Sequence, residues 1–146
     1  IEQASQVFEA ARHLDHVAAC VLNRAYFYLA VDKPSAAWDE LWLAADRFPI
    51  AFETGLDLEA TVLHAWLLYV RGERAGLDGA LATLGQAAED DCSLLGPMVL
   101  QLVSLMTHLQ RDEFAQAQQF FASHSAPATV TLRTAWRAMG RHCAAE

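Results

Sequence analysis

The side chains best suited to binding a metal ion lie near the N-terminus. His13, His16 and Cys20 are spaced i, i+3 and i+7, which would place them on one face of a single continuous helix. Imidazole and thiolate groups are ligands that zinc accepts, so this pattern is one that a zinc site could use. The helical pattern breaks near Leu14, however, and no fourth ligand follows at a suitable spacing. We therefore expect no metal and no cofactor, with the histidines capping helices or partly buried.

A catalytic cysteine needs a base beside it, and the sequence offers none in the right place. Cys143 directly follows His142, but adjacent side chains on a helix point in different directions. Cys20 lies among alanine, valine and leucine residues, a setting typical of an inert core position. Residues 89–91 are acidic but lack the alternating ligands and glycine of a calcium loop, and no phosphate-binding loop, nucleophile elbow or H-E-x-x-H helix occurs. We expect no enzyme, and a small all-α enzyme is the least favoured alternative.

The composition indicates one well-packed domain that spans residues 1–146. The chain is 54% hydrophobic and 19% charged, which excludes intrinsic disorder and supplies enough apolar surface for a core. No apolar run reaches the roughly 18 residues that a membrane span requires. Because the first residue is Ile1 instead of methionine, we interpret the chain as a domain excised from a larger protein or as a processed product.

The charge distribution argues against nucleic acid as a partner. The formal net charge is −8, and residues 51–100 carry eight acidic and two basic side chains. Such a surface repels a phosphate backbone. The three cysteines are too few for a disulfide framework, which favours reduced thiols and a cytoplasmic location.

Apolar residues recur with helical spacing along almost the whole chain, which predicts an all-α fold. Caps, prolines and glycines divide this pattern into eight expected helices. The expected ranges are 2–12, 15–31, 34–48, 58–71, 77–89, 97–110, 112–124 and 127–144. The connections are short, so consecutive helices should pair as antiparallel hairpins.

One stretch carries small and large apolar residues at the spacing of a repeated helical hairpin. Its members are Ala25, Tyr28, Ala37, Leu41, Ala44 and Pro49. This set resembles the tetratricopeptide repeat, and weaker copies of the second-helix spacing follow at residues 80–87 and 114–121. The resemblance covers about residues 18–125 and implies three hairpins stacked as a right-handed array with a C-terminal capping helix. The alternative is a generic helical bundle.

In tetratricopeptide arrays the first helix of each hairpin lines a concave groove, so the resemblance also implies a set of partner-binding residues. They are Leu22, Tyr26, Leu29, Val62, Trp66, Tyr69, Leu102 and Met106. This groove would be apolar and aromatic instead of basic, which suits an amphipathic helix of a partner protein. The alternative is that these residues pack inside a closed bundle.

Two further patterns concern the surface. Arg133, Arg137 and Arg141 are spaced i, i+4 and i+8, which makes a basic ridge along the last expected helix. The ridge would pair with the acidic residues between 53 and 91, in the same molecule or in another, or form the solvated side of a capping helix. Trp38 and Trp42 are spaced i, i+4, and we expect at least one of them in the core.

These patterns favour a protein–protein interaction module of the scaffold or chaperone type. The expected partner is another protein or peptide, not nucleic acid or a membrane, and a homodimer is compatible with this interpretation. The alternative is the helical-repeat region of a bacterial transcriptional activator, which would sense a small inducer or a regulatory protein.

Overall fold

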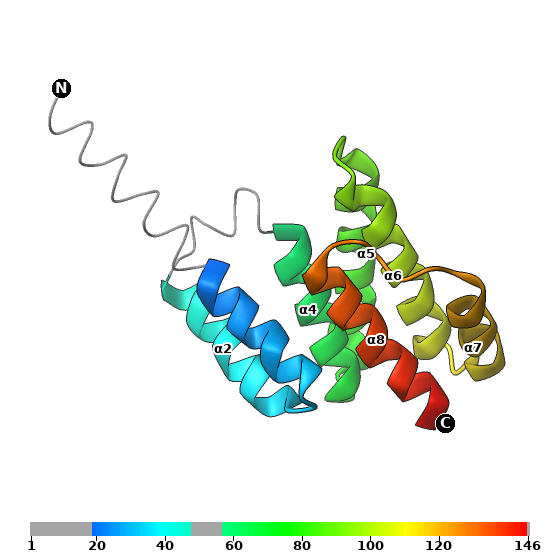
Figure 1. The fold of residues 1–146 in the computed structure, drawn as a ribbon, viewed down its shortest axis with the longest axis horizontal. Coiled ribbons are helices and arrows are strands. Elements are labelled where there is room, and N and C mark those ends of the chain that lie inside the picture. The colour runs from blue at the N-terminus through cyan, green and yellow to red at the C-terminus, as the bar shows by residue number, and fades with distance from the viewer. Residues whose placement is uncertain (1–18, 48–56, 146) are drawn as a thin grey trace, which may run out of the picture.

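The computed structural model describes residues 19–47 and 57–145, and this part of the chain is built from helices with no strand. A helical segment over residues 19–30 precedes the labelled helices (Figure 1). These are α2 (Pro34–Arg47), α4 (Asp57–Val70), α5 (Arg74–Asp90), α6 (Leu95–Gln110), α7 (Phe114–Ser123) and α8 (Val130–Ala145). The all-α prediction is confirmed for the described residues. The expected helix over residues 2–12 lies outside them.

Two helix starts differ by three residues from the sequence-based expectation, and the other differences are smaller. The fifth expected helix begins at Arg74 instead of Leu77, because the chain turns sharply at Gly72 and the Leu77 N–H already donates to the Glu73 carbonyl. The last helix begins at Val130 instead of Pro127, where the Arg133 N–H donates to the Thr129 carbonyl at 2.9 Å. In both cases the local hydrogen bonds decide the boundary, and residue type alone does not.

Three turns join the helices of successive hairpins, and all three have the same backbone structure. Each places a residue with positive φ two positions after the last helical residue of the first helix: Asp32 at 59°, Gly72 at 77° and Asp112 at 57°. In the first turn the Asp32 N–H donates to the Leu29 carbonyl and the next N–H donates to the carbonyl five residues back. The other two turns repeat both bonds. This is the Schellman arrangement, which ends a helix at a left-handed residue.

The turns recur at positions 32, 72 and 112, so the hairpin repeats every 40 residues. Buried positions follow the same period. Three positions of the first helix are buried in every hairpin: Leu22, Val62 and Leu102 at one, Ala25, Ala65 and Leu105 at the next, and Tyr26, Trp66 and Met106 at the third. One position of the second helix is buried in the same way, by Ala37, Leu77 and Ala117. The period exceeds the 34 residues of the tetratricopeptide repeat.

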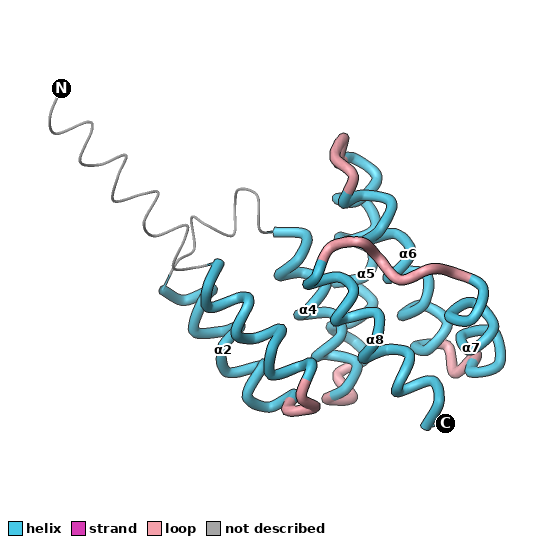
Figure 2. The backbone as a smooth tube through the Cα atoms, viewed as in Figure 1, coloured by secondary structure: helices cyan, strands magenta, loops and turns pink. Residues whose placement is uncertain are grey.

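The helices are stacked in the order of the chain. α4 packs against α2 before it and α5 after it, and α6 packs against α5 and α7. The first helices α4 and α6 also contact each other, and α8 lies across α4, α6 and α7 (Figure 1). Figure 2 shows the three turns at one end of the array and the α5–α6 connection at the opposite end. The buried side chains of all these helices form one continuous core.

Candidate functional site

The surface formed by the first helices of the hairpins is covered by α8. The apolar side of α8 is buried over its whole length. Its buried members are Leu132, Ala135, Trp136, Ala138, Met139, Gly140 and Cys143. The spacings of three, four and seven residues among them are those of an amphipathic helix seated in a groove. We refer to the surface of α4, α6 and α7 that receives α8 as the α8 groove.

The structure buries the partner-binding residues that the sequence suggested. Seven of the eight are buried, and Tyr69 is half-buried. The buried ones are Leu22, Tyr26, Leu29, Val62, Trp66, Leu102 and Met106. Some face a neighbouring hairpin, since the Tyr26 hydroxyl donates to the Glu59 carbonyl of α4 at 2.5 Å. Burial raises the pKa of Tyr26 well above its usual value, so this phenol stays neutral. At these positions the chain covers itself, as in the alternative of a closed bundle, and contact of these residues with a partner stays a prediction.

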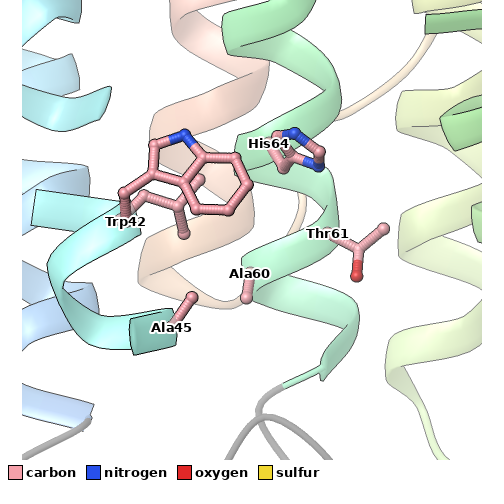
Figure 3. Close-up of a pocket in the computed structure, with 6 residues that line it drawn as sticks. Trp42, Ala45, Ala60, Thr61 and His64 are labelled. Carbon is pink, nitrogen blue, oxygen red and sulfur yellow. The ribbon is translucent and has the colours of Figure 1, made fainter. Parts of the chain in front are cut away.

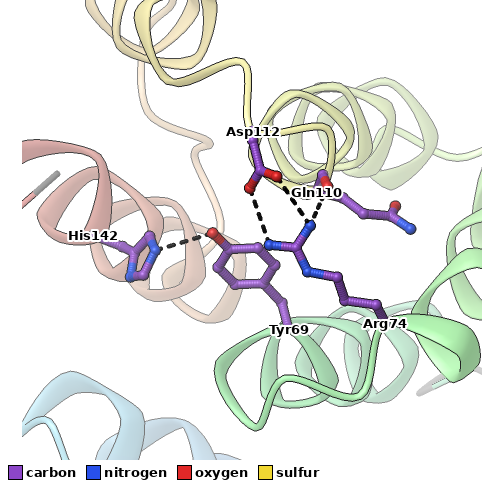
Figure 4. Close-up of polar contacts among 5 residues, drawn as sticks. All are labelled: Tyr69, Arg74, Gln110, Asp112 and His142. Atoms are coloured by element: carbon purple, nitrogen blue, oxygen red, sulfur yellow. Dashed lines mark hydrogen bonds and ion pairs between the residues drawn. The ribbon is translucent and has the colours of Figure 1, made fainter.

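The C-terminal half of α8 is held by an aromatic and polar cluster, of which Figure 4 shows Tyr69 and His142. The rings of Trp66 and Tyr69 are stacked at 5.3 Å, and His142 meets both edge-on at 5.7 Å and 5.1 Å. The Tyr69 hydroxyl and the His142 Nε2 form a hydrogen bond of 3.0 Å. On the α7 side, the Gln118 amide donates to the Cys143 carbonyl at 2.8 Å. This cluster combines residues separated by more than 70 positions in the sequence.

The middle of α8 fits closely against α7. The indole of Trp136 stacks on the ring of Phe121 with a centroid distance of 4.9 Å and an interplanar angle of 25°. Gly140 lies against the same ring, and a Cβ atom added there would overlap Phe121. Close packing of this kind tolerates little added volume. The glycine thus lets α8 approach α7 at this point.

A bridge between turns stabilises the second and third hairpins (Figure 4). The guanidinium of Arg74 donates to the Gln110 carbonyl at 2.8 Å and pairs with Asp112 at 3.0 Å. The hydrogen bond and charge of Asp112 raise the pKa of Arg74. Asp112 is the residue with positive φ in the third turn, and Arg74 is the first residue of α5. Their ion pair therefore links the third hairpin to the second.

The predicted basic ridge lies on the outer side of α8. Arg137 and Arg141 are exposed, and Arg133 is half-buried. Within the described ranges 19–47 and 57–145, none of the three arginines forms an ion pair, and pairing with acidic residues of another molecule stays a prediction. Arg141 instead donates a long hydrogen bond of 3.4 Å to the Leu29 carbonyl.

An aromatic cluster between α2 and α4 forms a second exposed feature. Trp42 is 48% exposed and meets Trp38 and His64 edge-on at 5.6 Å each, while the Arg71 guanidinium lies 4.2 Å from the centre of the Trp38 ring. Beside it is a shallow cavity of about 130 Å³ (Figure 3). Partial burial lowers the pKa of His64. The sequence indicated the tryptophan pair but not His64, because only the packing of α2 on α4 brings them together.

A larger hollow of about 290 Å³ lies where the C-terminal end of α8 faces the first hairpin. We call it the end pocket. Its lining comes from the first turn, from α4 and from α8. The lining residues are Leu29, Asp32, Pro34, Trp66, Val70, Ala138, Arg141, His142 and Ala145. α8 packs on α4 and α6 and leaves this space beside the first hairpin.

Of the three residues in the possible zinc pattern, His13 and His16 lie outside the described part of the chain, and Cys20 is exposed. Within residues 19–47 and 57–145 no three His, Cys, Asp or Glu side chains are grouped so that they could hold a metal ion. In the same ranges, each helix is too short or too polar to cross a bilayer.

Comparison with protein-family models, with curated proteins and with solved structures finds no match to this chain.

Proposed function

We propose that this domain is a protein–protein interaction module whose α8 groove binds an amphipathic helix of a partner protein. In the absence of that partner the groove holds the chain's own α8. The observation that carries the proposal is the seating of α8, because an amphipathic helix with buried residues at every turn occupies this surface. A partner helix would use the same apolar contacts.

The composition of α8 supports an exchange between α8 and a partner. Its buried side contains small residues beside Trp136 and Met139, and its polar outer side carries three arginines. Among the described residues, α8 makes polar contacts with the other helices and turns only through Arg141, His142 and Cys143, so its attachment is mainly apolar. An apolar attachment can be replaced by another helix with the same spacing, because apolar contacts are not directional.

We further propose that the hairpins form a right-handed tetratricopeptide-like array with α8 as its capping helix. The contact between α4 and α6, and the sequential contacts of α2, α4, α5, α6 and α7, support this arrangement. The 40-residue period departs from the tetratricopeptide length, so the similarity concerns the shape of the array.

The experiment compares capture of proteins from a lysate by the wild-type chain and by Met139→Asp. Met139 is fully buried, so a carboxylate there favours release of α8. Ala144→Asp, an exposed position on the same helix, is the matched control. Circular dichroism checks that the remaining helices persist.

The proposal predicts a partner that Met139→Asp captures more strongly than the other two chains. A synthetic peptide of residues 128–146 should compete with that partner, because it carries the apolar side of α8. Equal capture by all three chains, or capture that the peptide does not reduce, would contradict the proposal.

A further inference from the structure

The end pocket contains two opposite charges that are not paired with each other. Asp32 comes from the turn of the first hairpin and Arg141 from α8, and both line the pocket. Neither forms an ion pair with any residue of the described ranges. The only side-chain hydrogen bond of Arg141 recorded there is the 3.4 Å contact with the Leu29 carbonyl. The pocket therefore offers a carboxylate and a guanidinium to a ligand.

The position of Asp32 is distinctive among the three equivalent turns. In the second turn the left-handed residue is Gly72, which has no side chain, and in the third it is Asp112, whose carboxylate pairs with Arg74. Left-handed backbone disfavours residues other than glycine. Asp32 occupies this conformation and forms no ion pair with another described residue. Its carboxylate is therefore available at the end pocket.

The remaining walls of the end pocket are mostly apolar. Leu29, Pro34 and Val70 lie on the side of the first hairpin and α4, and Trp66 adds an aromatic surface. The volume of about 290 Å³ is at the lower end of the range for small-molecule sites. A ligand of this size is closer to one amino acid than to a nucleotide.

From these features we infer that the end pocket binds a small zwitterion with an apolar side chain, of the free amino-acid class. The ligand carboxylate pairs with the Arg141 guanidinium, which suits bidentate binding of a carboxylate. The ligand ammonium pairs with Asp32, and the apolar side chain lies against Trp66 and Val70. A ligand with only a negative charge would be repelled by the Asp32 carboxylate. A ligand with only a positive charge would be repelled by the Arg141 guanidinium.

This ligand would join the first hairpin to α8. In the free chain the contact between them that involves Arg141 is one long hydrogen bond to Leu29. A zwitterion held by both Asp32 and Arg141 therefore stabilises the seated position of α8. This site shares Trp66 with the partner contacts proposed for the α8 groove, and because α8 forms one of its walls it exists only while α8 is seated.

The test is calorimetric titration of the wild-type chain with L-leucine and L-phenylalanine. The control compounds are 4-methylpentanoate and 3-methylbutylamine, which keep the leucine side chain but carry only one of the two charges. The variants are Arg141→Gln and Asp32→Asn, with Arg133→Gln as the matched change on the same helix outside the pocket.

We expect at least one amino acid to bind and each pocket variant to weaken that binding roughly 10-fold or more, the effect of losing a hydrogen bond to a charged group. Arg133→Gln should bind as the wild type does. Amide shifts at Val70 and Ala138 in nuclear magnetic resonance spectra should locate the ligand. The inference is overturned if neither these two nor any other standard amino acid binds, if a control compound binds as tightly as its amino acid, or if Arg133→Gln weakens binding as much as Arg141→Gln.

Discussion

Replacing Gly140 with alanine is expected to destabilise the domain, although the same change elsewhere in a helix stabilises it. Alanine is favoured over glycine in a helix interior by about 0.5–1 kcal/mol. At Gly79 of α5 a Cβ atom meets no heavy atom within 4 Å, so Gly79→Ala should gain that free energy. At Gly140 the added Cβ overlaps the ring of Phe121, which is stacked on Trp136.

The magnitude follows from adding the two effects. Overpacking a well-packed site destabilises by roughly 1–3 kcal/mol, which outweighs the gain in helix propensity. We therefore expect Gly140→Ala to lower the free energy of unfolding by about 1 kcal/mol, and the two variants to differ by about 2 kcal/mol. Urea denaturation followed by circular dichroism measures both midpoints.

The reasoning depends on the contact between Gly140 and Phe121. If Gly140→Ala raised the urea midpoint as much as Gly79→Ala does, α8 would not approach α7 as closely as described. The double variant Gly140→Ala/Phe121→Ala provides a second check. Removing the ring removes the overlap, so adding Gly140→Ala to a Phe121→Ala chain should no longer destabilise it.

Three further outcomes follow from buried groups. Cys143 is buried and burial raises its pKa, so its thiol should react with iodoacetamide far more slowly than the two exposed cysteines. Gly140→Ala should accelerate that reaction. Equal rates for all three thiols would contradict the seating of α8. The pKa of His64 is lowered by burial from 6.5, so the folded state binds its proton less readily than the unfolded state. Neutral His64 should contribute its full share of the free energy of unfolding above about pH 6.5, and this share should be lost as the pH falls through the lower pKa of the folded state. His64→Gln should therefore reduce the change of the urea midpoint with pH in this acidic range. Tyr26→Phe removes the hydrogen bond to the Glu59 carbonyl and should lower the free energy of unfolding by about 0.5–1.5 kcal/mol. Because the Tyr26 pKa is raised, the wild type should also lose stability above pH 10 in a way that the variant does not, and an unchanged alkaline profile would count against its burial.

The helices could be predicted because their information is local. Apolar spacing, Pro34 and Gly72 placed most boundaries within a few residues. The 40-residue period was harder to recognise, because equivalent core positions share burial without sharing residue type or size: Tyr26, Trp66 and Met106 occupy one position in three hairpins. The spacing of the second helices indicated hairpins without giving their common period.

The occupied groove could not be predicted from local patterns. The sequence shows that α8 is amphipathic, but its place depends on contacts with residues far away in the chain. Tyr69 and His142 are 73 positions apart, and Gly140 fits against Phe121 only in the assembled array. The end pocket likewise needs Asp32 and Arg141 from opposite ends of the described chain.

The most direct measurement of the central claim is the fluorescence anisotropy of a labelled peptide of residues 128–146 titrated with the full-length Met139→Asp chain. The account predicts saturable binding, because the α8 groove is vacated and the peptide carries the wild-type apolar side. A peptide with Trp136→Asp should not bind, and the wild-type chain should bind the unaltered peptide weakly, since its own α8 competes at high effective concentration. No binding to Met139→Asp with its other helices intact, or equal binding of both peptides, would contradict a groove that accepts an amphipathic helix.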